Sequence, residues 1–348
     1  MDILKKLLRW LTSFVAIILA ALMCNFVCSH PSEDVENTVS SFYREPNNTL
    51  DFVVIGSSAA NKDIYPAVFW QEQKITGYNY SIGACSGNIY SSVLREVLST
   101  QKDALIIIDI DGFLVDDKFQ NELDPIRIWL DSIPKNKNWI RSVKELDPEN
   151  KTEHFFPFIR YHRNMTSIYE YARITASLTE KKLHNTRDAM KGATLNPNID
   201  QVGGTRFFAS DDLREPLTEK SDKVFKEFVE ECNDVEDIRI LFVNLPKKNA
   251  YEASVERNIQ YSHRANTIKD YVKANNYDYL DLCSEESGLQ LEDSDFTDTL
   301  HLSENGAIKF SSYFAKYLAE NYEFSEKDDA TAKSWDDDFE IYKTIVHQ

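Results

Sequence analysis

Residues Asp51–Pro66 read DFVVIGSSAANKDIYP, and this stretch decides the expected fold. It opens with the apolar, β-branched run 52–55, which is short enough to be a buried strand. Gly56 ends the run, and two small hydroxylated residues, Ser57 and Ser58, follow it. A strand that ends in this way brings backbone N–H groups and an exposed hydroxyl to the carboxyl edge of a sheet, where open α/β proteins bind ligands. We therefore expect Ser58 to be a nucleophile, with Ser57 as the alternative.

A general base for this serine is expected near the other end of the chain. Residues 298–307 read DTLHLSENGA and lie just before a predicted helix. A serine hydroxyl needs a base within hydrogen-bond reach, and the base needs a third group that fixes its tautomer and orientation. His301 and Asp298 supply both from one turn, and in a parallel sheet they can meet Ser58 at the carboxyl edge. The structural alternative is that His301 lies in the core and Asp298 caps the helix.

An acyl-transfer site also needs donors for the oxyanion that forms in the transition state. We expect the backbone N–H groups of Ser58 and of Gly83 or Gly87 to serve, because glycine allows a close approach without a Cβ. The side chain of Asn88 or Asn61 is a further candidate donor. The alternative is that both glycines only shape their turn.

Short apolar runs alternate with segments of helical periodicity along much of the chain. The predicted strands cover residues 52–55, 77–81, 105–111, 238–246 and 277–282, and the predicted helices cover 68–74, 90–100, 255–275 and 303–321. Such alternation is typical of a parallel sheet covered by helices. In the last two helices we expect the following residues to point inward: Ile259, Ala265, Ile268, Val272, Ala307, Phe310, Phe314 and Leu318.

Residues 112–235 lack this alternation, and we expect them to form a large, mainly helical insertion after the third strand. An excursion at the carboxyl edge is well placed to act as a lid or a substrate platform. It contains the aromatic and basic stretch HFFPFIRYHRN at 154–164. Arg160, His162 and Arg163 are candidates for binding an anionic or polyol substrate. Alternatively, they form a structural cluster that closes the insertion onto the sheet.

The apolar run 10–28, WLTSFVAIILAALMCNFVC, is long enough to cross a bilayer as a helix. Basic residues precede it and acidic residues follow it, so the positive-inside rule places the amino terminus in the cytoplasm and the remainder outside. A signal anchor is favoured over a cleaved signal peptide because no small-x-small site follows the apolar core. The expected organisation is a stub and anchor at 1–30, a juxtamembrane linker at 31–50, an α/β domain at 51–322 and an acidic, mobile or surface-lying tail at 323–348.

The composition disfavours several function classes. The 348 residues carry a formal net charge of −18, and nucleic-acid binding needs a basic face. The five cysteines show neither a metal-site spacing nor a disulfide framework. Cys85 is a minor alternative nucleophile, and Asp109 and Asp111 end a strand where site residues occur. The H-E-x-x-H, Walker, G-x-G-x-x-G and G-x-S-x-G motifs are absent, and we expect no metal and no cofactor.

Three short blocks resemble those of the SGNH/GDSL hydrolase superfamily: Gly56-Ser57-Ser58 after the first strand, Gly83 and Gly87 after the second, and Asp298-x-x-His301 before the last helix. The resemblance covers about residues 50–320 and implies a flavodoxin-like, three-layer α/β fold. It also implies that Ser58 is the nucleophile, His301 the base and Asp298 the orienter. The family's Gly-x-Asn-Asp block is replaced by the sequence DIDG at 109–112, so the usual asparagine oxyanion donor is unassigned.

A narrower resemblance is to bacterial, membrane-anchored members that accompany membrane-bound O-acyltransferases in teichoic-acid D-alanylation or polysaccharide O-acetylation. It rests on residues 156–163, which are similar to a Tyr-His-x-Arg-Trp stretch in those proteins although the Trp is absent, and on residues 301–310. Such relatives often lack the Gly-x-Asn-Asp block. The resemblance implies a single-pass protein of the cell membrane whose catalytic domain is extracytoplasmic. Its substrate would be an envelope polysaccharide or a teichoic-acid-like polymer.

The function that follows is a serine-dependent O-acyl transferase or esterase acting on a cell-envelope glycan through an acyl-Ser58 intermediate. The alternative is a non-catalytic protein that keeps the fold and docks on a membrane-bound O-acyltransferase, and the missing block favours it. A third interpretation is a pure deacetylase.

Overall fold

The computed structural model describes residues 2–27, 33–161, 168–183 and 187–346, which divide into two compact units. The sheet unit comprises Thr38–Ile126 and Arg187–Gln348. The helical unit comprises Met1–Asn37 and Arg127–Thr186. Two helices, α2 (Glu33–Phe42) and α8 (Leu123–Ser132), contain the boundaries.

The sheet unit is built on a five-stranded parallel sheet in the order β2-β1-β3-β5-β7. Its strands are β1 (Phe52–Ile55), β2 (Gly77–Asn79), β3 (Leu105–Asp109), β5 (Arg239–Asn244) and β7 (Asp278–Asp281). In this flavodoxin-like order the chain moves outward on both sides of the β1–β3 pair, which makes the carboxyl end of that pair the topological switch point. The predicted α/β class with a parallel sheet is confirmed.

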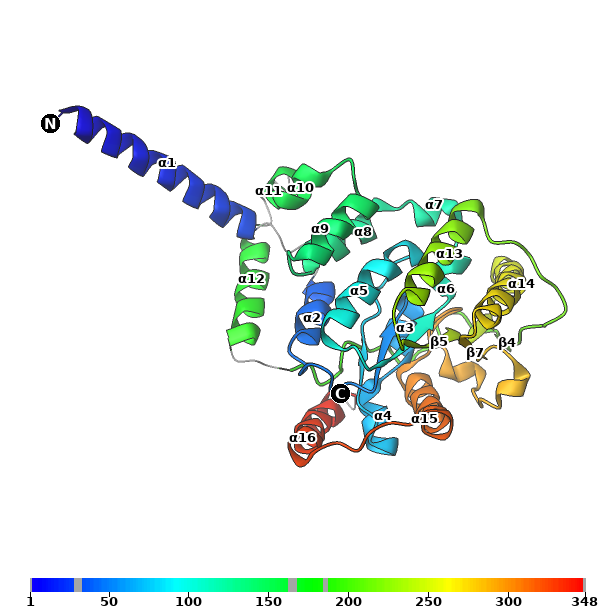
Figure 1. Ribbon diagram of the computed structural model, residues 1–348. Coiled ribbons are helices and arrows are strands. Elements are labelled where there is room, and N and C mark those ends of the chain that lie inside the picture. The colour runs from blue at the N-terminus through cyan, green and yellow to red at the C-terminus, as the bar shows by residue number, and fades with distance from the viewer. Residues whose placement is uncertain (1, 28–32, 162–167, 184–186, 347–348) are drawn as a thin grey trace. The chain divides into compact units, whose positions relative to one another are not determined.

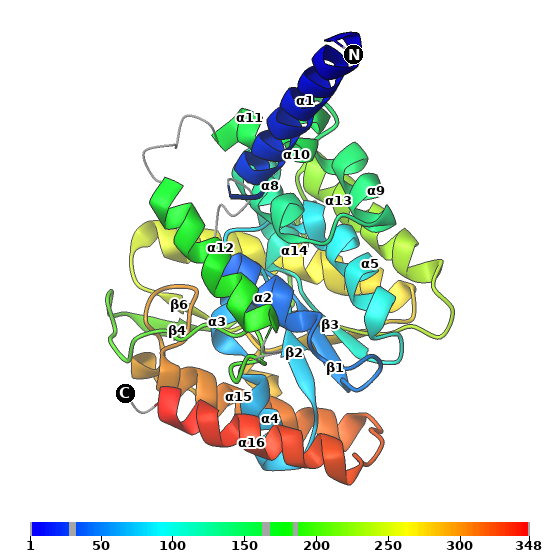
Figure 2. The ribbon, with the colours of Figure 1, turned by 90° about the vertical axis from the view of Figure 1, so that its left-hand side faces the viewer.

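Helices cover both faces of this sheet (Figures 1 and 2). One face carries α4 (Pro66–Gln73), α15 (Glu304–Asn321) and α16 (Asp329–Ile345), and the other carries α5 (Tyr90–Thr100), α13 (Glu219–Asn233) and α14 (Glu252–Ala274). Successive strand residues point to opposite faces. Phe52 therefore packs on Phe69 of α4 with ring centroids 4.7 Å apart, whereas Phe242 faces Phe225 of α13 on the other side.

Short elements complete the sheet unit. They are α3 (Ser58–Asp63), η1 (Gly87–Ile89), α6 (Asp111–Leu114), α7 (Asp117–Gln120), β4 (Thr205–Phe207), β6 (Lys247–Asn249), η3 (Glu285–Ser287) and η4 (Asp293–Asp295). β4 and β6 form a separate antiparallel pair. Most of these elements follow the carboxyl ends of the parallel strands, which is where an α/β protein builds its site.

Most of the predicted inward positions are buried, with one exception in α14. In α15 all four of its predicted positions are buried, and in α14 Ala265, Ile268 and Val272 are buried. Ile259 is 45% exposed, so that prediction is wrong. The reason is that the first half of α14 buries polar residues instead. There the Asn258 amide donates to the carbonyl of Lys248, at 3.0 Å.

The expected insertion 112–235 is not a single segment. Only Arg127–Thr186 belongs to the helical unit. Further along, α13 is a crossover helix that buries Phe225 and Phe228, and residues 187–193 enter the core of the sheet unit. The Lys191 carbonyl accepts a hydrogen bond from the Asn79 N–H at 2.8 Å, which extends the edge of β2. Because more than half of the residues of α13 are charged, its apolar face could not be recognised from the sequence.

The predicted linker at 31–50 and the predicted mobile or surface-lying tail at 323–348 each contain a helix with buried side chains. In the presumed linker, Phe42 is buried and its ring stacks on Tyr80, with centroids 4.3 Å apart. In the presumed tail, α16 buries Trp335 and Tyr342. Both segments are low in apolar residues. A few large aromatic side chains are enough to dock them on the core.

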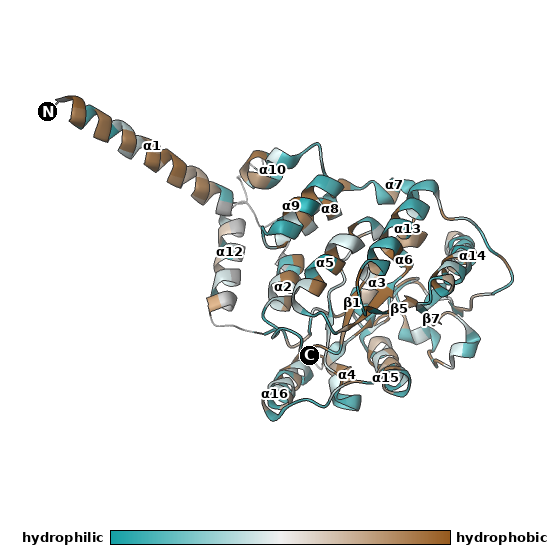
Figure 3. Cartoon of the chain, viewed as in Figure 1, coloured by the Kyte–Doolittle hydropathy of each residue, from teal (hydrophilic) through white to brown (hydrophobic). Residues whose placement is uncertain are grey.

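The helical unit contains α1 (Asp2–Val27), α9 (Lys137–Leu146), α10 (Lys151–Phe155), α11 (Pro157–Tyr161) and α12 (Ile168–Leu183). Within the described residues, one helical stretch, Ile3–Asn25, is long and apolar enough to cross a membrane, and a signal sequence near the amino terminus has the same character. Figure 3 shows α1 as largely apolar, and its side chains are exposed from Ile3 to Met23.

The docking of α16 gives a testable prediction about stability. Trp335 is 2% exposed, lies 5.7 Å from the Trp70 ring and faces the buried Lys191 ammonium at 4.4 Å. Trp335→Ala should therefore lower the free energy of unfolding by about 3–5 kcal/mol, measured by urea denaturation. Ile341→Ala is the control on the same helix, because Ile341 is 54% exposed. Equal effects of the two substitutions would show that α16 is not docked.

Candidate active site

Ser58 lies at the carboxyl end of β1, as the first residue of α3. Gly56 makes this sharp change of direction sterically feasible. A Cβ at Gly56 would lie 2.5 Å from the Ala60 Cβ and 2.8 Å from the Asp109 Cβ. Without a side chain at this position, α3 can begin directly above the end of β3. The turn therefore presents Ser58 at the switch point between β1 and β3.

Ser57 stabilises the turn through two hydrogen bonds to Asp109. Its backbone N–H and its Oγ both donate to Oδ2 of Asp109, at 3.1 and 3.0 Å. The other oxygen of Asp109 accepts the N–H of Asp111 at 2.9 Å. The hydroxyl of Ser57 is thus bound to a buried carboxyl group, whereas Ser58 faces the imidazole of His301. This difference favours Ser58 over Ser57 as the reactive hydroxyl.

His301 and Asp298 lie in one tight turn before α15. Oδ1 of Asp298 accepts the N–H groups of Leu300 and His301, at 2.8 and 3.0 Å. Its Oδ2 lies 2.8 Å from Nδ1 of His301. Backbone contacts close the same turn, because the N–H of Thr297 donates to the carbonyl of His301 at 3.0 Å. A single carboxylate therefore both shapes the turn and orients the ring.

The structure brings Ser58 and His301 together. The Ser58 Oγ lies 2.8 Å from Nε2 of His301. Burial alone would raise the pKa of Asp298, but the hydrogen bonds from His301 and from the N–H of Leu300 lower it to about 2. An ionised carboxylate only accepts hydrogen bonds, so Nδ1 of His301 carries the proton and Nε2 is left to accept from the serine. These distances match the geometry that a nucleophile, a base and an orienting group require.

Asp63 links the helix that carries Ser58 to the segment that follows His301. It ends α3, is completely buried, and its Oδ1 accepts the N–H of Leu302 at 2.8 Å. Burial raises the pKa of Asp63 well above its ordinary value, against the effect of that N–H. The helix that begins with Ser58 is thereby tied to the residue that follows His301.

A hollow of about 390 Å³ opens beside Ser58. Residues from several strand ends and from α14 line it: Ser57, Ser58, Ala59, Ala84, Cys85, Asp111, Val115, Asp116, Lys118, Phe119, Glu122, Arg257, Tyr261 and Leu300. The wall is largely apolar, and charged side chains stand among the apolar ones. Such a hollow is suited to hold an acyl group close to the Ser58 hydroxyl.

Only some of the expected oxyanion donors lie at this hollow. The N–H of Ser58 belongs to the first turn of α3, where helical N–H groups have no partner within the helix. Gly83 is exposed and immediately precedes Ala84, which lines the hollow with a positive φ of 57°. Gly87 is buried against the ring of Phe113 and does not line the hollow. The loop after β2 therefore reaches the hollow at Ala84 and Cys85 and not at Gly83 or Gly87.

The side chains of the two candidate asparagines, Asn88 and Asn61, donate hydrogen bonds to backbone carbonyl groups. The Asn88 amide donates to the carbonyl of Gln120 at 2.7 Å. The Asn61 amide donates to the carbonyls of Ser81 and Gly192, at 3.1 and 3.0 Å. Neither side chain lines the hollow. Both are more simply explained as supports for neighbouring loops than as oxyanion donors.

Arg160, the candidate binder of an anionic substrate, is occupied by acidic neighbours in the helical unit. It forms ion pairs with Asp131 and Glu153, both at 3.1 Å, and approaches Asp147 at 3.9 Å. The structural-cluster alternative fits this geometry better than substrate binding does. His162 and Arg163 lie outside the described residues.

Two further sequence candidates have structural explanations. Cys85 lines the hollow, but burial raises the pKa of its thiol, which disfavours the reactive thiolate. Asp111 is paired with the buried Lys247 at 2.8 Å. Lys247 was not singled out by any motif, and neither were Arg257 and Tyr261 on α14. Their spacing of four residues on one helix face is the only signal in the sequence that could have grouped the last two.

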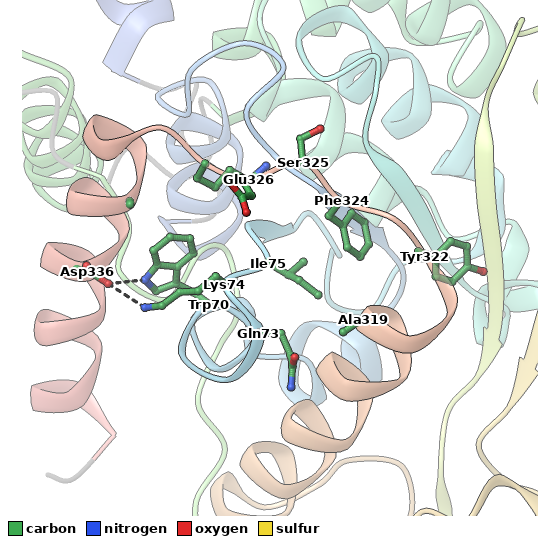
Figure 4. Close-up of a pocket in the computed structure, with 12 residues that line it drawn as sticks. Trp70, Gln73, Lys74, Ile75, Ala319, Tyr322, Phe324, Ser325, Glu326 and Asp336 are labelled. Atoms are coloured by element: carbon green, nitrogen blue, oxygen red, sulfur yellow. Dashed lines mark hydrogen bonds and ion pairs between the residues drawn. The ribbon is translucent and has the colours of Figure 1, made fainter.

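A second hollow, of about 550 Å³, lies between α4, the end of α15 and the segment that leads to α16 (Figure 4). At its edge Asp336 accepts hydrogen bonds from Trp70 and Lys74, at 2.8 and 3.2 Å. Its only hydroxyl side chains are those of Tyr322 and Ser325, and no histidine or cysteine is among its lining residues. We therefore assign it no chemistry.

Comparisons with known proteins leave the family open. No protein-family model and no curated protein matches the sequence. Among solved structures, the fold is similar to the crystal structure of the lipase/acylhydrolase from Enterococcus faecalis. The TM-score is 0.36 at 8% sequence identity, and the match covers 80% of this chain and 100% of that chain.

The link through Asp63 predicts a difference between two substitutions. Asp63→Ala leaves the buried N–H of Leu302 without an acceptor and should lower the free energy of unfolding by about 1–3 kcal/mol in urea denaturation. Asp63→Asn keeps an oxygen acceptor for this N–H and removes the cost of burying a charge, the same cost that raises the pKa of Asp63, so the loss should be smaller. If the asparagine variant is as destabilised as the alanine variant, the buried carboxyl group does not have this role.

The buried carboxyl group of Asp109 predicts a pH dependence of stability. Burial and the charge of Asp111 raise the pKa of Asp109 to about 7. Between about pH 4 and pH 7 the folded protein then binds more protons than the unfolded chain, so this group lowers the free energy of unfolding as the pH rises, by at most about 1.4 kcal/mol per pH unit. In Asp109→Asn this part of the slope should vanish. Parallel pH profiles for both proteins would contradict the assignment.

Proposed function

We propose that the protein is a serine-dependent acyl-transfer enzyme, an esterase or O-acyl transferase in which Ser58 forms an acyl intermediate. The observation that carries this proposal is a continuous chain of hydrogen bonds from the Ser58 hydroxyl through His301 to Asp298. The Ser58 Oγ lies 2.8 Å from His301 Nε2, and His301 Nδ1 lies 2.8 Å from Asp298 Oδ2. An orienting carboxylate, a base with a fixed tautomer and a hydroxyl at a strand end are the parts that nucleophilic catalysis by serine requires.

In the first half-reaction, the Ser58 Oγ attacks the carbonyl carbon of an acyl ester and His301 Nε2 takes the hydroxyl proton. The resulting imidazolium is stabilised by Asp298, which stays ionised because its pKa is about 2. The N–H of Ser58 and the backbone N–H groups of the loop at residues 83–84 are the candidate donors to the developing oxyanion. When the tetrahedral intermediate collapses, the ester C–O bond breaks and His301 returns the proton to the leaving oxygen.

In the second half-reaction, a hydroxyl of the acceptor attacks the acyl-Ser58 carbonyl. His301 takes the proton of that hydroxyl and returns it to the Ser58 Oγ as the acyl group leaves. Water as acceptor gives hydrolysis, and a sugar hydroxyl gives transfer. The hollow beside Ser58 has room for an acyl group as well as part of an acceptor.

We propose a cell-envelope glycan or glycopolymer as the acceptor and an extracytoplasmic location for the sheet unit. Two observations support this. The stretch Ile3–Asn25 is suited to cross a membrane, and basic residues precede it. The sequence also resembles membrane-anchored proteins of polysaccharide acylation. A membrane-bound O-acyltransferase is the partner that this resemblance implies.

A second candidate function is that of a non-catalytic partner protein with the same fold. One observation favours it: no asparagine or glutamine side chain is among the residues that line the hollow, whereas the carboxyl group of Asp111 is. A carboxylate that lines the hollow opposes an oxyanion formed there, although the ion pair with Lys247 offsets the charge of Asp111. The two candidates differ in whether Ser58 reacts.

The reactivity of Ser58 is tested with a fluorophosphonate and with p-nitrophenyl acetate. The wild-type protein should be labelled and should hydrolyse the ester, because His301 activates the hydroxyl. Ser58→Ala should abolish labelling and reduce kcat on the order of 10⁴-fold or more. Ser57→Ala is the matched control and should still be labelled, because the Ser57 hydroxyl only supports the turn.

Two outcomes would contradict the enzymatic proposal. Undiminished hydrolysis by Ser58→Ala would remove Ser58 as the nucleophile. A folded wild-type protein that neither reacts with the phosphonate nor cleaves the ester would favour the non-catalytic partner.

A further inference from the structure

The last turn of α1 is hydrogen-bonded to the α10–α11 hairpin of the same unit. The Asn25 side chain donates to the carbonyl of Phe155 at 3.4 Å and accepts the N–H of Phe158 at 3.2 Å. Asn25 is also the last residue of the stretch that is suited to cross a membrane. One amide side chain therefore binds the hairpin backbone on both sides of its bend, at one end of that stretch.

Four large apolar side chains of this hairpin are exposed. The exposed fractions are 49% for Phe155, 55% for Phe156, 36% for Phe158 and 45% for Ile159. We call these four residues the hairpin patch. Single exposed apolar residues are normal on a soluble surface, but four within five positions are not. In Figure 3 the apolar colour of this region lies beside the end of α1.

The opposite face of the hairpin is fixed by buried charges. His154 is completely buried, with Nε2 3.0 Å from Asp147. Arg160 is paired with Asp131, which also accepts the hydroxyl of Tyr161 at 2.7 Å. Turning the patch inward would break this network and leave charges without partners, at a high cost in free energy. The apolar side chains are therefore held outward.

The length of α1 sets the depth at which the patch lies. A helix from Ile3 to Asn25 is about 33 Å long, close to the thickness of about 30 Å of the hydrocarbon core of a bilayer. When this stretch crosses a membrane, Asn25 reaches the boundary between hydrocarbon and headgroups. Surface helices lie in that layer with side chains such as Phe, Trp and Leu buried at the boundary between headgroups and acyl chains, while their polar face stays hydrated.

We propose that the hairpin patch inserts into the headgroup layer of the membrane that α1 crosses, so that the helical unit is attached to lipid at two places. The occupant of the patch is the lipid bilayer itself. The continuity with α1 favours lipid over a protein partner, because the hydrogen bonds of Asn25 bring the patch to the membrane surface whenever α1 is inserted. Phe156 is the most exposed of the four and provides the largest share of the inserted surface, whereas the Phe155 ring also packs against Trp139, with centroids 4.8 Å apart.

The test uses the full chain in vesicles of phosphatidylcholine and phosphatidylglycerol, with Cys24 and Cys28 replaced by alanine. The remaining Cys85, Cys232 and Cys283 are buried. The environment-sensitive dye NBD is therefore attached to one introduced, exposed cysteine in each variant: Phe156→Cys, Leu11→Cys within α1, and Lys144→Cys on the exposed, polar side of α9. Lipids with a nitroxide near the headgroup or near the chain end then quench the dye. Melting curves followed by circular dichroism check that each variant is folded.

The dye at position 156 should show blue-shifted emission and lose intensity most with the shallow nitroxide. The dye at position 11 should respond most to the deep nitroxide, and the dye at position 144 to neither. If the dye at position 156 behaves like the dye at position 144, lipid insertion of the patch is refuted. A blue shift at position 156 in native membranes but not in pure lipid vesicles would refute it as well, and would indicate a protein occupant.

Discussion

The candidate site depends on one hydrogen bond between side chains that are 243 positions apart, from the Ser58 hydroxyl to the His301 imidazole. Neither partner occupies its position by chance. Ser58 starts a helix at the end of β1, and His301 ends a turn that Asp298 closes. Both segments leave the same edge of a parallel sheet, so the topology that buries the apolar strands also aligns the polar groups. The geometry of the candidate site is therefore a direct consequence of the strand order.

Buried carboxyl groups give this alignment its precision. Asp109 binds the turn before Ser58, and Asp63 binds the segment after His301. Both are completely buried, and burial raises the pKa of each. Burying such groups costs stability, which is offset by the backbone N–H groups that they satisfy. As a result, the segments that carry Ser58 and His301 are positioned by specific hydrogen bonds as well as by apolar packing.

Much of the sheet unit could be predicted from the sequence. The strands are short apolar runs that end in small or polar residues, and α15 shows its apolar face at regular helical intervals. The pairing of Ser58 with the Asp298–His301 turn followed from the need of a serine for a base. These features are local patterns or follow from the geometry of a parallel sheet.

Other features depend on packing that a sequence pattern does not show. α13 and α16 are rich in charge, and only a few aromatic residues such as Phe228 and Trp335 dock them. Ile259 has the right helical spacing but lies where α14 buries polar groups instead. Lys247 and Asp63 carry no motif, because their importance arises from burial beside the site. The division of the residues after β3 between two units is likewise set by long-range contacts.

The central claim is tested most directly by the tautomer of His301, observed by nitrogen NMR of the ¹⁵N-histidine-labelled protein and assigned with His301→Gln. The account predicts that at neutral pH Nδ1 carries the proton, with a strongly hydrogen-bonded signal, and that Nε2 accepts. That signal should weaken in Asp298→Ala, and the Nε2 shift should change in Ser58→Ala. A His301 that is protonated at Nε2, or that is unaffected by both substitutions, would show that the hydrogen bonds from Ser58 through His301 to Asp298 are not formed in solution.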